Sequence, residues 1–212
     1  MEKFGRGGDK FGGLLKNFPF LRVRLQSVAN INFIQNVEEK LNYVFDAVKM
    51  TKKELPADIP LIGFAGAPFT IFAYMIEGSG SKTFSKAKQF LYTQPELAHQ
   101  LLDKITQSTI HYLKAQVEAG ADLIQIFDSW AGVLTEQMFY EFSLNYISKI
   151  CNAISSLVPV TIFAKDAHYA IEEISKTSCS VIGLDWTINP TIARQQAQHK
   201  TLQGNVDPCL LY

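Results

Sequence analysis

The sequence predicts an α/β fold built on parallel strands, in which a (β/α)8 barrel is favoured over a doubly wound sheet. Five short apolar segments after residue 59 alternate with helical segments, as parallel strands with helical crossovers require. Each apolar segment ends in a compact polar or glycine-containing signal, and barrel enzymes carry their chemistry at such strand ends. A dinucleotide-binding sheet would carry Gly-x-Gly-x-x-Gly after its first strand, and the sequence GFAG at residues 63–66 does not match that pattern.

The elements follow one another with recognisable start and stop signals. Residues 38–55 have apolar side chains at helical spacing, and Pro56 and Pro60 end that helix. Strands, most with the turn that follows them, are expected within residues 60–64, 121–130, 158–166, 180–186 and 201–208. Further helices are expected from a Ser81 cap to Tyr92, from a capping box at residues 93–96 to Gly120, over residues 135–157 and 167–177, and from Asn189 to about His199.

Residues 63–82, GFAGAPFTIFAYMIEGSGSK, combine glycines and a proline with large apolar side chains. The segment is too broken by Pro68 and the glycines to form one helix, and it is too apolar for an ordinary surface loop. We interpret it as a tight turn after the first strand, where Gly63, Gly66 and Pro68 let the backbone approach a ligand. Tyr74 is then expected near the top of the barrel.

Composition and charge exclude several classes of protein. The 212 residues, of which 47% are hydrophobic, suffice for a sizeable core, and the formal net charge of zero predicts no basic surface for nucleic acid. An anionic substrate would be held by a few local cations. No secretory segment opens the chain, and no apolar run reaches the roughly 18 residues of a membrane helix. The wide spacing of Cys151, Cys179 and Cys209 predicts no structural metal site and a reducing cytoplasm.

Two strand ends carry hydroxyl groups suited to a carboxylate-bearing ligand. The phenol of Tyr74 can donate a hydrogen bond without adding charge, and Ser129 follows the apolar strand 123–127. The structural alternative is that Tyr74 is a half-buried core aromatic, while Asp128 and Ser129 form an ordinary turn that caps the next element. The residues alone leave both interpretations open.

Charged residues follow the later strands. Lys165, Asp166 and His168 could form a site in which the lysine binds an anion and the histidine transfers a proton, although Asp166 equally suits an N-cap. Further strand-end side chains of undetermined role are Asp185, Trp186, Asn205 and Asp207.

Five segments together resemble the uroporphyrinogen decarboxylase family of haem and tetrapyrrole biosynthesis. They are PLIGFAGAPFTIFAYMIEGSGSK, LIQIFDSWAGVL, VPVTIFAK, VIGLDW and LQGNVDPCLLY, and they occur in one order with plausible spacing. The likeness runs from about Glu38 to Tyr212, and residues 63–78 are similar to the family's second signature. Residues 1–37 lack this likeness, so we expect an atypical, poorly ordered segment over 1–37 and a partial barrel over 38–212.

The resemblance implies a (β/α)8 TIM barrel, a cytoplasmic homodimer and a carboxy-lyase that uses no cofactor or metal. The implied reaction removes four acetate carboxyls from uroporphyrinogen III and gives coproporphyrinogen III. Tyr74 matches the family tyrosine that contacts this tetrapyrrole substrate, and Ser129 matches the substrate-binding hydroxyl residue after the fourth strand. Phe127 would pack near the macrocycle. Neither nucleic acid nor a membrane is an expected partner.

Several family motifs have no counterpart in this sequence. The Arg-Gln-Ala-Gly-Arg opening, the aspartate of the second strand that holds the pyrrole N–H groups, and the Gly-His-Gly stretch after the eighth strand are all missing. We therefore expect an incomplete barrel with about strands three to seven of eight and two unpaired sheet edges. Such a chain would be marginally stable and would have little or no decarboxylase activity.

Two alternatives to a truncated decarboxylase stay open. One is a non-catalytic, degenerate partial barrel whose exposed apolar edges cause association. The other is a corrinoid-dependent methyltransferase of the same superfamily, which would activate a thiol on zinc held by a His-x-Cys pair and a distant cysteine. His168 is followed by Tyr169 and Ala170, so the sequence lacks that pair.

Overall fold

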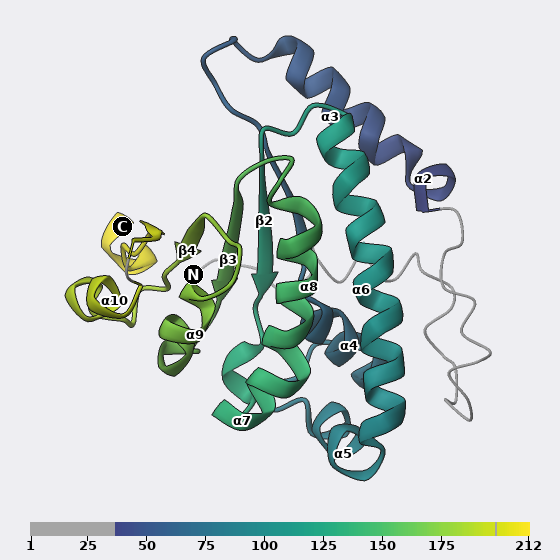
Figure 1. Cartoon of the computed structure of the whole chain (residues 1–212), viewed down its shortest axis with the longest axis vertical. Helices are drawn as coiled ribbons and strands as arrows, with labels where there is room; N and C mark the ends of the chain where they lie inside the picture. Colours follow the sequence, from purple (N-terminus) through teal and green to yellow (C-terminus); the bar gives the residue numbers. More distant parts are fainter. Residues whose placement is uncertain (1–36, 198) are drawn as a thin grey trace, which may run out of the picture.

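The computed structural model describes residues 37–197 and 199–212 of the protein (Figure 1). Its centre is one sheet of five parallel strands in the order β1-β2-β3-β4-β5. The strands are β1 (Ile62–Gly66), β2 (Leu123–Asp128), β3 (Val160–Ala164), β4 (Val181–Gly183) and β5 (Thr201–Gln203). Consecutive strands pair with one another, which confirms the predicted α/β order of an incomplete barrel. The expected disorder of residues 1–37 lies outside the described residues, apart from Val37.

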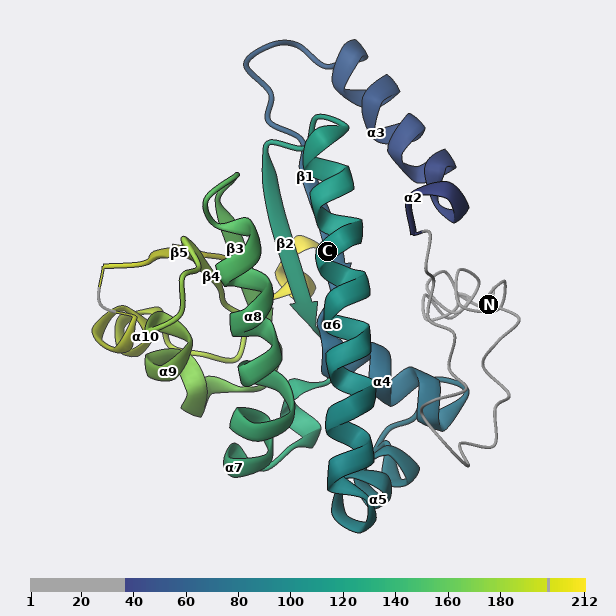
Figure 2. The same ribbon diagram turned by 45° about the vertical axis from the view of Figure 1, so that its right-hand side comes forward.

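Helices connect successive strands and cover one face of the sheet (Figures 1 and 2). Before and after β1 lie α2 (Val37–Lys40), α3 (Asn42–Glu54), α4 (Pro68–Glu77), α5 (Ser85–Thr93) and α6 (Pro95–Glu118). Between β2 and β3 lie the short turn η2 (Ala131–Val133), α7 (Glu136–Phe139), the π-helical turn η3 (Tyr140–Leu144) and α8 (Asn145–Ile154). The remaining helices are η4 (His168–Ala170), α9 (Ile171–Ser175), α10 (Pro190–Gln196) and η5 (Pro208–Leu211).

The two faces of the sheet differ because side chains alternate along each strand. On the helix-covered face, Ile124 and Ile126 of β2 are fully buried in the main core. On the opposite face, Ile62 and Phe64 of β1 are each 46% exposed. In the described part of the chain, β1 and β5 each pair with one neighbour only, so the sheet has two unpaired edges.

Residues 63–82 do not form the irregular turn expected from the sequence, because α4 begins at Pro68. A proline fits the first turn of a helix, where its missing N–H has no intrahelical partner. The helix ends at Gly78, which adopts a left-handed conformation with φ 78° and donates its N–H to the carbonyl of Tyr74. The glycines and the proline therefore bound a ten-residue helix, and Tyr74 lies on that helix.

Other helix boundaries also differ from expectation. Ser81 is not the cap of α5, because that helix begins at Ser85. The Ser81 hydroxyl instead accepts the N–H of Phe84 at 3.1 Å in the preceding turn. The expected capping box at residues 93–96 is wrong, since Gln94 is the N-cap of α6 and makes no side-chain cap bond. The expected Asn189 cap is confirmed, because its side chain accepts the N–H of Thr191 at 2.9 Å.

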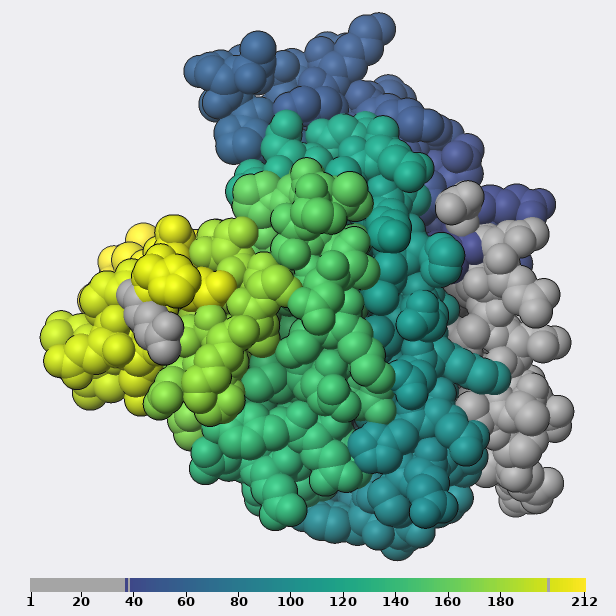
Figure 3. Space-filling view, in the orientation of Figure 1, coloured from purple at the N-terminus to yellow at the C-terminus, as the bar shows by residue number. Residues whose placement is uncertain are grey.

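The last strand–helix units form a lobe beside the main body, drawn in yellow-green and yellow in Figure 3. This lobe contains α9, α10 and the short strands β4 and β5, as Figure 1 also shows. Among the described residues, no helix has the length and apolar character needed to cross a membrane.

Candidate functional site

The carboxyl ends of the strands meet at one edge of the sheet because all five strands are parallel. Partner residues near these ends are Gly66 with Phe127, Phe127 with Phe163, and Phe163 with Gly183. The loops that follow β1, β2, β3 and β4 therefore start close together. They carry the polar side chains singled out in the sequence.

Tyr74 is half-buried on α4 and packs against the loop that follows β2. Its ring meets Trp130 edge-on with 6.2 Å between centroids, and Phe84 edge-on at 5.7 Å. Phe84 and Trp130 lie 4.5 Å apart, so the three rings form one aromatic cluster. Within the described residues, the Tyr74 hydroxyl has no hydrogen-bond partner. The Tyr74 ring is thus a half-buried core aromatic, as the structural alternative expected, while its hydroxyl is free to bond a ligand.

Ser129 follows directly on β2 and is half-buried. Its hydroxyl also has no partner among the residues that the structure describes. Because Tyr74 contacts Trp130, which is the next residue after Ser129, both hydroxyl-bearing residues belong to one rim of the sheet.

Phe127 lies on the open face of the sheet in a row of three phenylalanines. Its ring is 5.9 Å from that of Phe64 on β1 and 5.9 Å from that of Phe163 on β3, each in an edge-to-face arrangement. The row forms an apolar surface beneath the rim. It is the surface against which a flat hydrophobic ring system would pack.

Asp128 is the polar residue whose importance the sequence understated. It is fully buried on the helix-covered face, where Thr70 donates to Oδ1 at 2.6 Å and Ser143 donates to Oδ2 at 2.5 Å. Burial raises the pKa of Asp128 to about 6, although the hydrogen bonds from Ser143 and Thr70 act to lower it. A turn-forming aspartate is common, and only the fold brings the two hydroxyl donors to this one.

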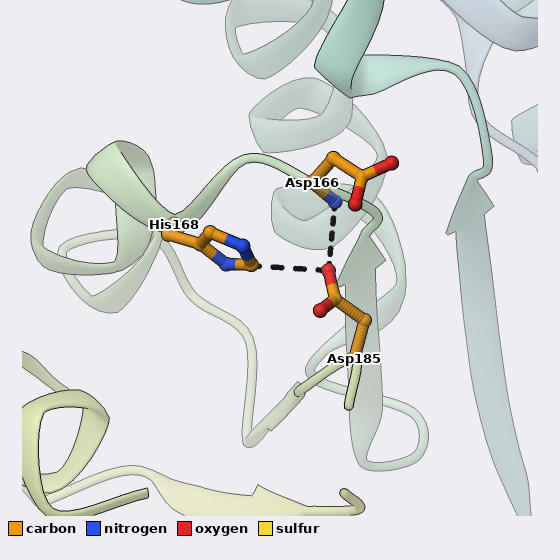
Figure 4. Close-up of side chains that lie close together, drawn as sticks. All are labelled: Asp166, His168 and Asp185. Atoms are coloured by element: carbon orange, nitrogen blue, oxygen red, sulfur yellow. Dashed lines mark hydrogen bonds and ion pairs between the residues drawn. The ribbon is translucent and has the colours of Figure 1, made fainter. Parts of the chain in front are cut away.

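The loops after β3 and β4 form a charged cluster of Asp166, His168 and Asp185 (Figure 4). Oδ2 of Asp185 accepts the N–H of Asp166 at 2.7 Å and lies 4.0 Å from Nδ1 of His168. Oδ1 of Asp185 accepts the N–H of Thr187 at 2.9 Å and its hydroxyl at 2.6 Å. Burial acts to raise the pKa of Asp185, but the hydrogen bonds from Thr187 and Asp166, together with the nearby His168, lower it overall.

The cluster brings together three residues that could each offer one ligand atom to a metal ion, with those atoms within 4.8 Å of one another. The Asp185 carboxylate already accepts three hydrogen bonds, so its geometry is that of a loop anchor. Lys165 donates to Asp166 at 2.9 Å and lies over the Trp186 ring at 5.6 Å. The predicted grouping of Lys165, Asp166 and His168 thus exists, and its lysine is paired with a carboxylate.

The remaining strand-end residues hold the last loops in place. Asn205 donates through Nδ2 to the backbone carbonyls of Ile188 at 2.7 Å and Asp185 at 3.2 Å. Asp207 accepts the N–H of Cys209 at 2.9 Å and so caps η5. Their visible roles are structural.

The model of the family described as uroporphyrinogen decarboxylase matches residues 15–212. The match begins before Glu38, so the expectation that residues 1–37 share no likeness with this family is wrong for residues 15–37.

Curated relatives with the name uroporphyrinogen decarboxylase are similar over most of the chain. The protein from Flavobacterium johnsoniae is 46% identical over 196 residues, which are 91% of this chain and 58% of that protein. The protein from Chlorobaculum parvum is 47% identical over 198 residues, with coverages of 91% and 56%, and that from Schizosaccharomyces pombe is 45% identical over 206 residues, with coverages of 92% and 57%. The chain thus spans little more than half the length of these relatives.

A solved structure described as a methyltransferase from Methanosarcina mazei superposes on this chain with a TM-score of 0.72. The two share 19% sequence identity, and the superposition covers 81% of this chain and 51% of that one. At this identity the likeness shows a common fold alone.

Proposed function

The chain belongs to the uroporphyrinogen decarboxylase family, and we propose that its strand-end rim forms part of a site for uroporphyrinogen III. The observation that supports the proposal is the aromatic contact of Tyr74 with Trp130, the residue that follows Ser129. The phenylalanine row around Phe127 would support the macrocycle. Tyr74 and Ser129 would donate hydrogen bonds to its carboxylates.

The proposed reaction replaces each acetate arm by a methyl group. Protonation of the pyrrole ring beside the arm creates an electron-poor centre. The bond between the methylene and carboxylate carbons then breaks, carbon dioxide leaves, and its bonding electrons neutralise the ring. Return of the ring proton to solvent and protonation of the methylene carbon complete the methyl group. The protein has to bind a polyanion, exclude water and stabilise the developing cation.

We further propose that this polypeptide alone turns over slowly or not at all. The open face leaves Phe64 46% exposed, so water reaches the surface beneath the rim. Lys165 is held by Asp166, which removes a local cation from the substrate carboxylates. A cytoplasmic homodimer is part of this proposal because the family resemblance implies it.

The test measures binding and turnover separately. Uroporphyrin III, the stable oxidised macrocycle, is titrated against the chain by fluorescence, and decarboxylation of uroporphyrinogen III is followed by chromatography of the oxidised products. We expect Tyr74→Phe and Ser129→Ala each to weaken binding about tenfold, while Tyr92→Phe at an exposed site on α5 leaves it unchanged. Equal binding by all four proteins, or turnover comparable to that of a full-length relative, would contradict the proposal.

A second candidate function is association through the open sheet face, without catalysis. The specific observation in its favour is the exposure of Ile62 and Phe64 on an edge strand, because such strands pair readily with other chains. We expect Phe64→Glu to shift the chain to smaller species in sizing chromatography, whereas Tyr92→Glu does not. Monomeric behaviour of the unchanged chain at high concentration would remove this candidate.

A further inference from the structure

Thr70 and Tyr74 are four residues apart on α4 and therefore lie on the same face of that helix. Because both residues belong to one helix, the position of Thr70 determines where the Tyr74 side chain projects from α4. Thr70 is buried, and its hydroxyl donates to Oδ1 of Asp128 at 2.6 Å. The hydroxyl-bearing rim and the buried carboxylate are thus joined through one turn of helix.

The same Thr70 hydroxyl accepts the backbone N–H of Trp130 at 3.4 Å. Its two partners, Asp128 and Trp130, are the residues on either side of Ser129. Thr70 therefore holds the loop on both sides of Ser129, and the contact between Trp130 and Tyr74 closes the ring of interactions.

A second hydroxyl fixes the other oxygen of Asp128. Ser143 lies in the π-helical turn η3 and donates to Oδ2 at 2.5 Å. Single π-helical turns within α-helices often occur at functional sites. With a donor on each oxygen, the carboxylate is held between α4 and η3 and cannot rotate freely.

This arrangement is not one that stability alone would favour. A fully buried carboxylate loses its hydration, and burial raises the pKa of Asp128 although the hydrogen bonds from Ser143 and Thr70 act to lower it. Burial raises the pKa of the Tyr169 phenol to about 12, and the negative charge of Asp128 acts in the same direction. A group that destabilises its own fold is consistent with a role in arranging a site.

We propose that Asp128 is a positioning residue that, through Thr70, sets Tyr74 and Ser129 at the spacing that a polyanionic ligand requires. This proposal rests on the proposed function for the identity of the ligand. Asp128 itself is fully buried on the helix-covered face, so a ligand bound on the open face would not contact it. Its effect is transmitted by one hydrogen bond to α4 and by the backbone to Ser129.

The first test does not depend on any ligand. The chain has two tryptophans, so Trp186→Phe leaves Trp130 as the only indole reporter. Trp130 Nε1 is buried, and we expect acrylamide to quench its fluorescence weakly. Thr70→Val, which removes the hydroxyl at nearly constant shape, should raise the quenching constant about twofold or more. Thr70→Ser should restore the original value.

The matched control is Thr106→Val in α6. Thr106 is also buried, but its hydroxyl donates to the Leu102 carbonyl within its own helix. It should lower stability without changing Trp130 quenching. If Thr70→Val leaves the quenching constant unchanged in a folded protein, or if Thr106→Val raises it equally, the positioning role is overturned.

The second test asks whether Thr70 acts through Tyr74. Dissociation constants for uroporphyrin III are measured for Thr70→Val, Tyr74→Phe and the double variant. We expect Thr70→Val to weaken binding about tenfold when Tyr74 is present and about threefold in the Tyr74→Phe background, where its effect on the Ser129 loop remains. Additive losses would overturn the transmission through Tyr74. If the unchanged chain does not bind uroporphyrin III, the proposed function fails, and the quenching result alone decides the positioning role.

Discussion

The buried carboxylate of Asp128 predicts an unusual pH dependence of folding stability. Its pKa is raised to about 6 in the folded protein from an ordinary value of 3.8. The folded state therefore binds a proton more tightly than the unfolded state does. Stability contributed by this group is complete below pH 3.8 and is lost as the pH rises through 6. Acidification from neutral pH should consequently stabilise the protein at this site.

The size of the effect follows from the linkage relation. Each pKa unit corresponds to about 1.36 kcal/mol, so a shift of about two units gives a full effect of about 3 kcal/mol. Between pH 7.5 and pH 5, roughly 1 kcal/mol of this gain is realised, because pH 5 lies about one unit below a folded-state pKa of about 6. Asp128→Asn has no proton to bind and should lack this gain.

The assay is urea unfolding at pH 7.5 and pH 5 of the unchanged chain and of Asp128→Asn. Taking the difference between the two proteins cancels the other titrating groups. Asp122→Asn is the matched control: the Leu61 N–H and the Lys52 ammonium lower the pKa of Asp122, so it does not titrate in this window. A pH-independent difference between the unchanged chain and Asp128→Asn, or a gain on raising the pH, would refute the reasoning.

Two further predictions concern the loops after β2, β3 and β4. Gly132→Ala should destabilise the fold by roughly 1–3 kcal/mol in urea unfolding, because the added methyl would overlap the side chain of Asp166. The control Gly80→Ala, with open space around it, should change stability by less than about 0.5 kcal/mol. Equal effects of the two substitutions would contradict this prediction. Asp185→Ala should lower the free energy of unfolding by about 2–4 kcal/mol, because it leaves the N–H groups of Asp166 and Thr187 unpaired. A nearly unchanged free energy of unfolding would show that these loops do not depend on the Asp185 carboxylate.

The strands were predictable because their signals are local. Most are short apolar runs followed by a glycine or a polar residue; Leu123–Asp128, for example, ends at an aspartate. The alternation with helices predicts parallel pairing. The helix α4 is not predicted from residue types alone, because proline and glycine are typical helix breakers. Only their positions relative to the helix ends, with Pro68 in the first turn and Gly78 after the last, make them compatible with a helix.

The polar network beneath the rim could not be predicted from local signals. Thr70 and Asp128 are 58 residues apart, and Ser143 reaches the carboxylate from a π-helical turn that sequence spacing does not reveal. Tyr74 and Ser129 were singled out from the residues at strand ends and from a family resemblance. Their common rim, joined through Trp130, is a tertiary contact.

At the end of β2, two consecutive side chains point to opposite faces of the sheet. Phe127 points to the open face and packs with Phe163, while Asp128 points to the helix-covered face and is gripped by Thr70. Ser129 then starts the loop that the same Thr70 holds on both sides. Because the supporting groups lie on the opposite face from the phenylalanine row, they can be altered without removing any surface that a macrocycle would touch. A change in ligand affinity on removal of the Thr70 hydroxyl would therefore report geometry and not lost contact.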